Sequence, residues 1–365
     1  MTTTANDTSS RPPAPATAAV WSGVDKGFSV EALPLPELRP GELLVRTELA
    51  TICGSDLHTI NGDRPTPLPT VLGHEAIGHV VSTAGDVTGS DGELLVAGDR
   101  VTWTIGTSCG ACRRCRRGTP QKCLTVRKYG HEAIDGHWKL NGGFGTHVHL
   151  LAGTGVVKLA PGLPAAVAVP ANCATATVVC AARRVDLDSD DAVVVIGCGM
   201  LGLSAVAYAR DRGCTTVIAC DVDPARRALA ERFGATVVVE PAGLAEATKQ
   251  HGADVVFELS GNSRAVQSAF EVADLAGRIA LVGSVSPAPE ISFEPSAFVK
   301  NLTTVVGSHN YRLDDLAEAV DFLQRTRAQQ LFADLIPAPY PLDQVVEAVA
   351  LANAADAPRI AISFP

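Results

Sequence analysis

Apolar and polar residues are patterned differently in the first and second parts of the chain. Over about residues 20–170, runs such as 41–50 and 76–85 alternate or cluster apolar residues over strand lengths, and glycine and proline bound them. Such a pattern is typical of an antiparallel or barrel-like β domain. The sequence therefore predicts a β-rich first domain.

After about residue 175 the apolar runs become continuous. The run 191–199 (DAVVVIGCG) ends in glycines, as a buried parallel strand does. Asp223 and Pro224 supply an N-cap and a first-turn proline, and Gly234 closes the helix that they open. Further strand-like runs lie at 215–221, 236–240, 254–260, 278–283 and 303–308. Strands that alternate with helices predict a doubly wound parallel sheet, and hence an α/β fold class.

These patterns divide the chain into three parts. Residues 1–19 are rich in Thr, Ser, Ala and Pro, and we predict a disordered tail there. Residues 20–174 form the β-rich domain and residues 175–312 the doubly wound domain. The remainder, 313–365, is expected to return to the first domain, because 359–364 (RIAISF) is a strand with no helix after it.

Composition narrows the class of protein. Of the 365 residues 46% are hydrophobic and 19% are charged, which is ample material for a globular core. The formal net charge of -9 argues against nucleic acid and anionic membranes as partners, since both select basic surfaces. No apolar run reaches the ~18 residues of a membrane span, and no secretory signal is recognisable. We therefore expect a cytoplasmic protein.

Three glycines lie where the first doubly wound strand gives way to its helix. Gly197, Gly199 and Gly202 form G-x-G-x-x-G in this strand–turn–helix context. The first glycine permits a tight turn, the second lets a pyrophosphate approach the backbone, and the third lets helix and strand pack closely. The pattern predicts a dinucleotide site, with a glycine-rich turn of another α/β fold as the alternative.

The next strand indicates which dinucleotide binds. Asp221 ends that strand, where an acid accepts hydrogen bonds from the adenosine ribose and repels a 2′-phosphate, which favours NAD over NADP. Arg226, one turn into the following helix, is a candidate contact at the adenosine end.

Four of the ten cysteines are closely spaced. Cys109, Cys112, Cys115 and Cys123 read C-x2-C-x2-C-x7-C, which indicates metal binding in a large chain without an export signal. Four thiolates complete a tetrahedral zinc shell and leave no open position, so the pattern predicts a structural zinc. An iron–sulfur cluster is the alternative, because similar spacings hold iron.

A second candidate constellation is dispersed along the chain. It consists of Cys53 in C-G-S-D-L-H, His74 and Glu75 in G-H-E, and Cys173 in A-N-C-A-T-A-T. A single buried cysteine or histidine usually belongs to the core. Three mixed ligands that leave a fourth position open would instead make a catalytic zinc site. Spacing alone does not bring these residues together.

Over residues 20–365 the chain resembles the zinc-containing alcohol dehydrogenases of the medium-chain dehydrogenase/reductase superfamily. The likeness rests on 73–87 (GHEAIGHVVSTAGDV), 98–101 (GDRV), the four cysteines, the glycine triplet and the closing strand. It implies a GroES-like β-rich catalytic domain, a Rossmann domain, two zinc ions per chain and NAD.

The resemblance also implies roles near the catalytic metal. Cys53, His74 and Cys173 would be its ligands. Glu75 would be the neighbouring carboxylate that can approach the metal, and Asp56 would orient His74 from behind.

Other matched positions concern the proton and the cofactor. Ser55 and His58 match the proton relay of the family, although a lone His58 would more often be an exposed loop residue. Thr177 matches a residue near the nicotinamide, and Arg359 an arginine that approaches the pyrophosphate. Gly54 departs from the pattern, because some members carry a basic residue there for the phosphates.

These residues predict an NAD-dependent dehydrogenase of a primary or secondary alcohol, in which zinc is a Lewis acid and the nicotinamide takes the hydride. An aldehyde or ketone reductase would use the same residues in reverse. A non-catalytic NAD-binding protein is the alternative from another class, and the loss of ligands or relay would be its sign. Family likeness and an exposed edge strand favour a homodimer or homotetramer.

The substrate is less clear from the sequence. A basic run surrounds the four cysteines, and it is either a solvated face or subunit contact, or a recruiting surface for an anionic phosphonate or phosphate ester. The segments RRCRR and 128–132 (KYGHE) look closest to a branch associated with phosphonate metabolism, with oxidoreductases of cyclic secondary alcohols second. Trp103 and Ile105 would line an apolar pocket wall or belong to the core. The run comprises Arg113, Arg114, Arg116, Arg117, Lys122, Arg127 and Lys128.

Overall fold

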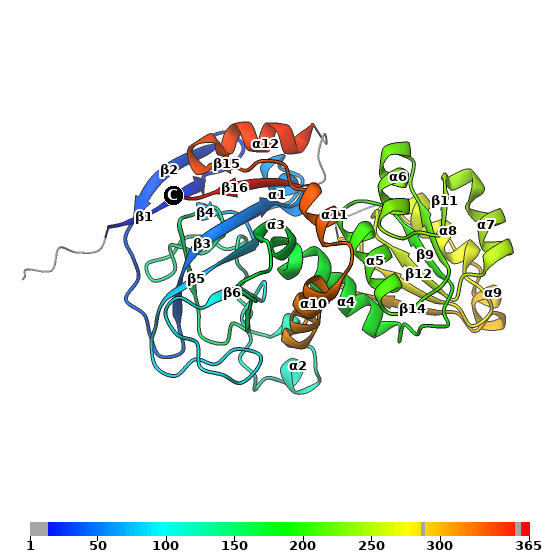
Figure 1. The fold of residues 1–365 in the computed structure, drawn as a ribbon, viewed down its shortest axis with the longest axis horizontal. Coiled ribbons are helices and arrows are strands. Elements are labelled where there is room, and N and C mark those ends of the chain that lie inside the picture. Colours follow the sequence, from blue (N-terminus) through cyan, green and yellow to red (C-terminus); the bar gives the residue numbers. More distant parts are fainter. Residues whose placement is uncertain (1–13, 286–288, 355–358) are drawn as a thin grey trace, which may run out of the picture.

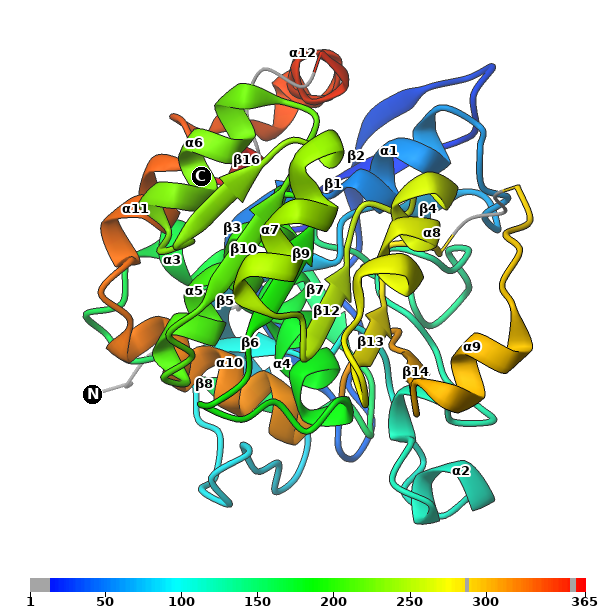
Figure 2. The same ribbon diagram turned by 90° about the vertical axis from the view of Figure 1, so that its right-hand side faces the viewer.

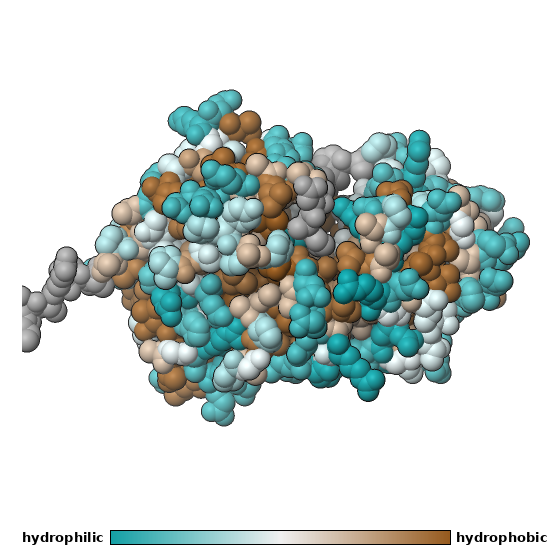
Figure 3. All heavy atoms as spheres, turned by 45° about the horizontal axis from the view of Figure 1, so that its top comes forward, coloured by the Kyte–Doolittle hydropathy of each residue, from teal (hydrophilic) through white to brown (hydrophobic). Residues whose placement is uncertain are grey.

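The computed structural model describes residues 14–285, 289–354 and 359–365. Figure 1 shows two lobes side by side: one contains the first and last parts of the chain, and the other contains the doubly wound segment. On the face drawn in Figure 3, hydrophilic residues cover much of both lobes, with hydrophobic residues scattered among them.

The first lobe is built on a sheet of seven strands. Its order is β15-β16-β3-β5-β6-β8, and β7 pairs with β3. Alternating inward apolar residues of these strands form a core that includes Val45, Val101 and Ile362. The strands are β3 (Leu43–Ile52), β5 (Glu75–Thr83), β6 (Arg100–Trp103), β7 (His147–Leu150), β8 (Val156–Lys158), β15 (Tyr340–Pro341) and β16 (Ile360–Ser363).

A smaller sheet of three strands lies beside it, in the order β2-β1-β4. Its strands are β1 (Ala16–Trp21), β2 (Phe28–Leu33) and β4 (Thr70–Val71). Strand β1 corrects the predicted boundary of the disordered tail, because residues 16–19 belong to this strand. Ala16, Ala18 and Ala19 are fully buried there, so the alanines that resembled a low-complexity tail are small core residues. The rest of the predicted tail, up to residue 13, lies outside the described residues.

The second lobe has a six-stranded, all-parallel sheet in the order β11-β10-β9-β12-β13-β14, which confirms the α/β fold class (Figure 2). In β9, Val193 and Val195 pack on the core that contains α4 and α5, whereas Val194 and Ile196 pack on the other face. Burial on both faces explains why the runs are continuously apolar. The strands are β9 (Val193–Ile196), β10 (Val217–Cys220), β11 (Val237–Val239), β12 (Val255–Glu258), β13 (Arg278–Leu281) and β14 (Thr304–Gly307).

Helices fill the connections. In α6, Asp223 accepts a hydrogen bond from the Ala225 N–H and Pro224 begins the helix, as the sequence predicts. The α-helices are α1 (Gly54–Ile60), α2 (Arg113–Arg116), α3 (Ala165–Ala168), α4 (Ala174–Arg184), α5 (Met200–Asp211), α6 (Pro224–Arg232), α7 (Leu244–His251), α8 (Ser263–Val272), α9 (Pro295–Lys300), α10 (Leu313–Arg325), α11 (Gln329–Asp334) and α12 (Val345–Asn353). The short 3-10 helices are η1 (Pro120–Lys122), η2 (Val169–Asn172), η3 (Pro241–Gly243) and η4 (Leu342–Gln344).

Within the described residues, no single helix is long and apolar enough to cross a membrane. The bent pair 165–172 and 174–184 reaches that length only when its two parts are taken together.

Candidate active site and metal centres

The register of three neighbouring strands brings the dispersed residues together. Ile360 of β16 lies opposite Ile52 of β3, and Thr51 of β3 lies opposite Glu75 of β5. Consequently Cys53, which follows β3, lies at the same end of the sheet as the G-H-E segment and as Arg359, which precedes β16. The pairing pattern supplies the proximity that the spacing of these residues could not predict.

The three predicted ligands of the catalytic metal converge. Cys53 Sγ lies 3.6 Å from Cys173 Sγ, and Cys173 Sγ lies 3.6 Å from His74 Nε2. All three atoms lie within 4.8 Å of one another. A tetrahedral zinc with ordinary Zn–S and Zn–N bonds separates its ligand atoms by about 3.5 to 3.8 Å, so the donor set fits a zinc ion and leaves a fourth position.

The electrostatics of Cys53 suit a metal, and those of His74 are set by a neighbouring carboxylate. A hydrogen bond from the Cys173 thiol, together with the charges of Arg359 and His74, holds the pKa of Cys53 well below its usual range although burial opposes this. A thiolate is the form of cysteine that binds metals. Burial lowers the pKa of His74, but the adjacent Asp56 carboxylate outweighs it and raises the value to about 10.

Asp56 is placed to orient His74. It is buried, and its Oδ1 lies 3.3 Å from His74 Nδ1 and accepts a hydrogen bond from the Gly73 N–H. Its Oδ2 accepts the Cys53 N–H at 2.9 Å, at the first turn of α1. One carboxylate therefore fixes the backbone of one ligand and the ring of another, which is the geometry of the predicted role.

Glu75 and Arg359 form a buried ion pair beside the same ligands. Arg359 Nε lies 3.0 Å from Glu75 Oε2, and its Nη2 lies 3.6 Å from Cys53 Sγ. Burial raises the pKa of Glu75 to about 7, although the charge of Arg359 acts against this. Arg359 thus contacts the metal-site residues directly, which the predicted pyrophosphate role did not include.

The two predicted relay residues occupy different environments. Ser55 Oγ lies 3.1 Å from His74 Nε2, at the ligand cluster. His58 lies one turn later in α1, is about half exposed, and contacts Asp63 at 3.2 Å. No hydrogen bond joins Ser55 to His58 among the described residues, so the structure puts them at the inner and outer ends of one helix turn.

The four closely spaced cysteines also converge. Neighbouring Sγ atoms lie 3.4 to 3.9 Å apart, and all four lie within 4.8 Å of one another. These separations again match the edges of a zinc tetrahedron, at about 3.8 Å. Backbone N–H donors, with the Cys115 thiol, lower the pKa of Cys112 to about 7. The structure therefore provides four converging donors in a lobe around α2, at the edge of the molecule (Figure 1).

The glycine triplet has the shape that a dinucleotide needs. A Cβ on Gly202 would lie 2.0 Å from the Gly197 carbonyl oxygen, whereas a Cβ on Gly199 would meet nothing within 4 Å. Gly197 has φ +96, a conformation that favours glycine. Gly202 thus permits close packing, and Gly199, the N-cap of α5, leaves space where a pyrophosphate is expected.

A cavity of about 350 Å³ opens from this turn toward α1. Gly199, Arg226 and Arg359 all line it, as does Gly54. Arg226 also pairs with Asp223 at 3.7 Å. The cavity joins three of the predicted cofactor residues into one space between the lobes.

Asp221 and Thr177 do not line this cavity. The carboxylate of Asp221 accepts the N–H groups of Cys198, at 2.7 Å, and of Asp223, at 2.9 Å, at the end of β10. Thr177 lies in the first turn of α4, where its N–H bonds to the Cys173 carbonyl. Asp221 therefore lies beside the glycine turn, and Thr177 lies one turn after the metal ligand Cys173.

Several residues that contact the site were not predicted from the sequence. Asn172 is fully buried, accepts the Ala76 N–H and donates to the Trp103 carbonyl, and its own carbonyl accepts a hydrogen bond from Tyr311. These bonds fix the backbone just before Cys173. The only signal in the sequence was the polar Asn172 in an otherwise apolar segment.

His131 and Arg64 were missed as well. The His131 ring packs edge-on against His74, with centroids 5.1 Å apart, and burial holds its pKa at about 3. Arg64 donates to the Ser55 carbonyl at 2.9 Å. His131 lies in the KYGHE segment, which was noted only for its family likeness.

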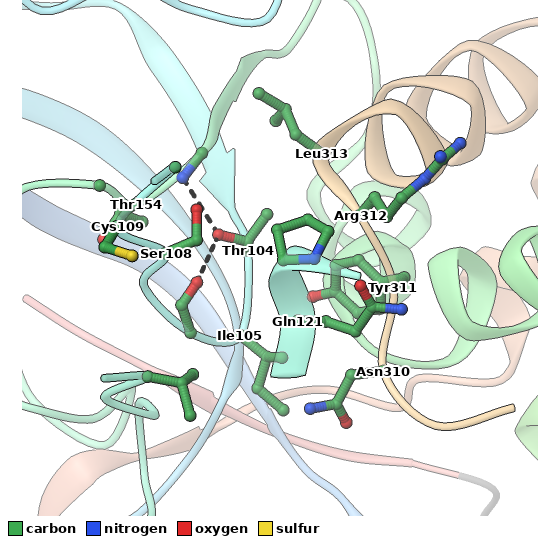
Figure 4. A pocket seen from close by; sticks show the side chains of 16 residues that line it. Thr104, Ile105, Ser108, Cys109, Gln121, Thr154, Asn310, Tyr311, Arg312 and Leu313 are labelled. Carbon is green, nitrogen blue, oxygen red and sulfur yellow. Dashed lines mark hydrogen bonds between the residues drawn. The ribbon is translucent and has the colours of Figure 1, made fainter. Parts of the chain in front are cut away.

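Trp103 and Ile105 lie in different surroundings. Trp103 is buried in the core of the first lobe. Ile105 lines a second cavity, of about 350 Å³, between the cysteine lobe and the start of α10 (Figure 4). Trp103 is therefore a core residue, whereas Ile105 faces a cavity.

Comparisons with known proteins identify the family. The alcohol dehydrogenase GroES-like domain matches residues 39–161, and the zinc-binding dehydrogenase domain matches residues 201–325. An alcohol dehydrogenase of Rhizobium meliloti (strain 1021) is 33% identical over 318 residues, which cover 84% of this chain and 87% of that protein. The chain belongs to the zinc-containing alcohol dehydrogenase family.

Solved structures agree with this alcohol dehydrogenase fold. An alcohol dehydrogenase from Thermotoga maritima superposes with a TM-score of 0.89 at 28% identity, covering 96% of this chain and 99% of that one. A zinc-binding dehydrogenase from Sinorhizobium meliloti bound to NADP gives 0.80 at 26% identity, with 96% and 99% covered. This alcohol dehydrogenase is therefore an oxidoreductase of the medium-chain superfamily, and its relatives support zinc and a nicotinamide cofactor.

Proposed function

We propose that this alcohol dehydrogenase transfers a hydride between a primary or secondary alcohol and NAD at a zinc held by Cys53, His74 and Cys173. The convergence of these three ligand atoms within 4.8 Å, beside Ser55, carries the proposal. A zinc ion held there supplies Lewis acidity, which makes an alcohol hydroxyl more acidic.

The remaining steps depend on residues of this chain. Ser55, whose Oγ lies at the ligand cluster, would accept the hydroxyl proton while its own hydroxyl proton passes on toward solvent. His58 exchanges the proton with solvent at the exposed end of α1, where Asp63 steadies its ring. Asp56 and the Glu75–Arg359 pair would keep the ligands in place, and a bound nicotinamide would supply the hydride acceptor.

For the cofactor we propose NAD. The side chain of Asp221 ends β10 beside the glycine turn, where a 2′-phosphate would meet its negative charge. Arg226 and Arg359 line the cavity that leads from that turn and would face the phosphates. Thr177, one turn after Cys173, would lie near the nicotinamide. A ratio of kcat/KM values for NADP over NAD above one would contradict this assignment.

A second zinc, at Cys109, Cys112, Cys115 and Cys123, is proposed as structural. All four coordination positions are used by thiolates, so it offers no place for a substrate. Together with the catalytic zinc, this site gives two proposed zinc ions per chain. If the four cysteines held an iron–sulfur cluster instead, the purified protein would absorb visible light.

We further propose a homodimer or homotetramer. Strand β14 is at the edge of its sheet, and Val299 and Leu302 beside it are both well exposed. An exposed apolar edge of this kind is commonly covered by a second subunit. Light scattering of the purified protein measures the state directly.

The test of the proposed function combines metal content with turnover. Purified protein is expected to contain about two zinc ions per chain and to reduce NAD with alcohols. Cys53→Ala should retain about one zinc and lose turnover. Unchanged turnover in Cys53→Ala would contradict the proposal, and a physiological reductase would differ only in which direction the cellular concentrations favour.

A further inference from the structure

Four basic side chains from separate segments gather next to the proposed active site. They are Arg64 after α1, Lys122 in η1, Lys128, and His309 after β14. Lys122 Nζ lies 2.6 Å from His309 Nδ1, so the imidazole accepts a hydrogen bond from the ammonium group. We call these four residues the basic cluster.

Their charges act on one another. Desolvation lowers the pKa of Lys128, and the charges of Lys122 and Arg64 lower it further. Desolvation and then the charges of Lys122, Lys128 and Arg64 hold the pKa of His309 at about 4. Arg64, Lys122 and Lys128 are therefore close enough to repel one another, and their charges help to keep His309 neutral.

The cluster borders the metal-site residues. Arg64 donates to the carbonyl of Ser55, the residue whose hydroxyl faces His74. His131, three positions after Lys128, packs against the His74 ring and also senses the charge of Arg64. An anionic group bound by the cluster would therefore be near an alcohol at the zinc.

Carboxylates do not neutralise the cluster. In the described part of the chain, none lies within salt-bridge distance of Arg64, Lys122 or Lys128. The acid that acts on Lys128 is Glu132, which pairs with Arg127 at 3.5 Å. Arg127 also pairs with Asp135 at 3.0 Å. The protein has a formal charge of -9, so acidic residues are in excess. The nearby carboxylates nevertheless form ion pairs with Arg127 and not with the cluster.

A second observation concerns the cavity lined by the chain neighbours of Lys122 and His309, which the four cluster residues themselves do not line. Asn310, next to His309, is 8% exposed, and its Nδ2 has no hydrogen-bond partner among the described residues. It lines the cavity of about 350 Å³ together with Gln121, the neighbour of Lys122. In Figure 4 the side chains of Gln121, Tyr311 and Asn310 lie near one another, with Ile105 facing them. A buried amide N–H without a partner is costly unless a ligand accepts from it.

We propose that the basic cluster and Asn310 bind an oxyanion group of the substrate, so that the preferred substrates are alcohols that carry a carboxylate or a phosphate-type group. The ammonium and guanidinium groups are donors only, and the free Nδ2 of Asn310 offers a further N–H donor to such an oxyanion. Binding relieves the repulsion among the cations and satisfies the amide. This inference rests on the proposed function and names its substrate class.

The structure also separates these residues from the rest of the basic run. Arg113, Arg114, Arg116 and Arg117 belong to α2 or its end and are exposed. Only Lys122 and Lys128 of the run belong to the cluster. The recruiting residues are thus two members of the run joined by Arg64 and His309, which the sequence did not associate with it.

The first experiment compares alcohols of similar size by NADH formation at saturating NAD: propanol, hydroxypropanoate and hydroxyethylphosphonate. We expect kcat/KM to be about 10- to 100-fold higher for an anionic alcohol than for propanol, the usual gain from hydrogen bonds to a charged group. About 0.5 M salt should reduce that ratio, because screening weakens partly exposed charges. The better of the two anionic alcohols identifies the oxyanion.

The second experiment removes one charge. Lys128→Met should lower the anionic-to-neutral ratio about tenfold, whereas Arg117→Met should leave it unchanged. Arg117 is a matched control, because it is exposed and its side chain has no hydrogen bond or ion pair among the described residues. Zinc content and circular dichroism establish that Lys128→Met is folded.

Inorganic phosphate gives a measurement that needs no variant. It should inhibit the wild-type enzyme competitively against the alcohol at saturating NAD, and Lys128→Met should weaken this inhibition. If no alcohol yields NADH, the proposed function fails. If propanol is oxidised as well as the anionic alcohols and phosphate does not compete, only the oxyanion site is overturned.

Discussion

The two proposed metal centres of this chain are built in opposite ways. The four-cysteine site takes all its ligands from a 15-residue stretch around α2, and its geometry depends on local turns. The other site takes Cys53, His74 and Cys173 from three distant segments: the register of β3 and β5 brings Cys53 to His74, and Cys173 comes from the start of α4. One centre is therefore encoded by spacing and the other by tertiary packing.

This difference predicts that loss of the four-cysteine site lowers stability, whereas loss of the dispersed site abolishes the reaction. Binding of a structural zinc contributes on the order of 10 kcal/mol to local folding in zinc-finger peptides. A ligand of an open site holds the metal on an already packed sheet, so its removal should affect the reaction and not the fold.

The largest expected effect tests that separation directly. Cys173→Ala should abolish turnover, retain about one zinc and keep a Tm near that of the wild type. Cys112→Ala should make residues 109–123 accessible to protease and lower the Tm. Metal analysis, NADH formation and differential scanning fluorimetry on both variants measure the contrast, which would disappear if the two behaved alike.

The next effect concerns the buried pair that closes the dispersed site. Arg359→Leu leaves the Glu75 carboxylate without its guanidinium in a buried setting, and we expect a loss of about 3 kcal/mol in the free energy of unfolding. Turnover should fall as well. Urea denaturation measures the loss, with Arg117→Met as the control. A stability equal to that of the control would show that β16 does not hold the ligand end of the sheet.

A smaller effect is expected from Asp56, whose carboxylate contacts Nδ1 of the proposed ligand His74. Asp56→Asn retains the shape but loses the charge that faces His74 Nδ1, so metal affinity or turnover should fall about 10- to 100-fold. Competition with a zinc chelator reports affinity apart from turnover. If neither quantity changes, the ring is oriented by its other contacts, such as His131.

The smallest pair of effects concerns the glycine turn, which spacing also predicts. Gly202→Ala should destabilise the enzyme by about 1 to 3 kcal/mol, because its Cβ would overlap the Gly197 carbonyl. Gly199→Ala has open space, so it should fold normally and instead raise the KM for NAD. Equal destabilisation by the two variants would contradict the roles inferred from their surroundings.

Much of the fold could be predicted from the sequence, because continuous apolar runs and the caps of α6 are local signals. The four closely spaced cysteines could be named from their spacing, whereas Cys53, His74 and Cys173 could be assigned as ligands only by family likeness. Their contacts could not be predicted, because a strand register is decided by packing over the whole sheet. Nothing in the sequence linked Arg359 to Cys53, or Arg64 to Lys128.

The tail boundary was wrong for a related reason. A segment rich in alanine, such as the one with Ala16, Ala18 and Ala19, has a composition typical of a tail. These alanines are buried in the core only because their strand pairs with β2. His131, Asn172 and Tyr311 act by holding or contacting a ligand. Residues of this kind have no characteristic spacing in the sequence, because any element that packs near the ligands can supply them.

The helix α4 has a consequence for engineering this enzyme. Cys173 is its N-cap, and the helix packs on α5, the helix that Gly199 opens. A graft that exchanged the cofactor lobe for that of a relative would therefore move one metal ligand along with it. The lobes are not interchangeable modules, because α4 packs on α5 of the cofactor lobe whereas η2, which precedes Cys173, packs on β5 of the first lobe.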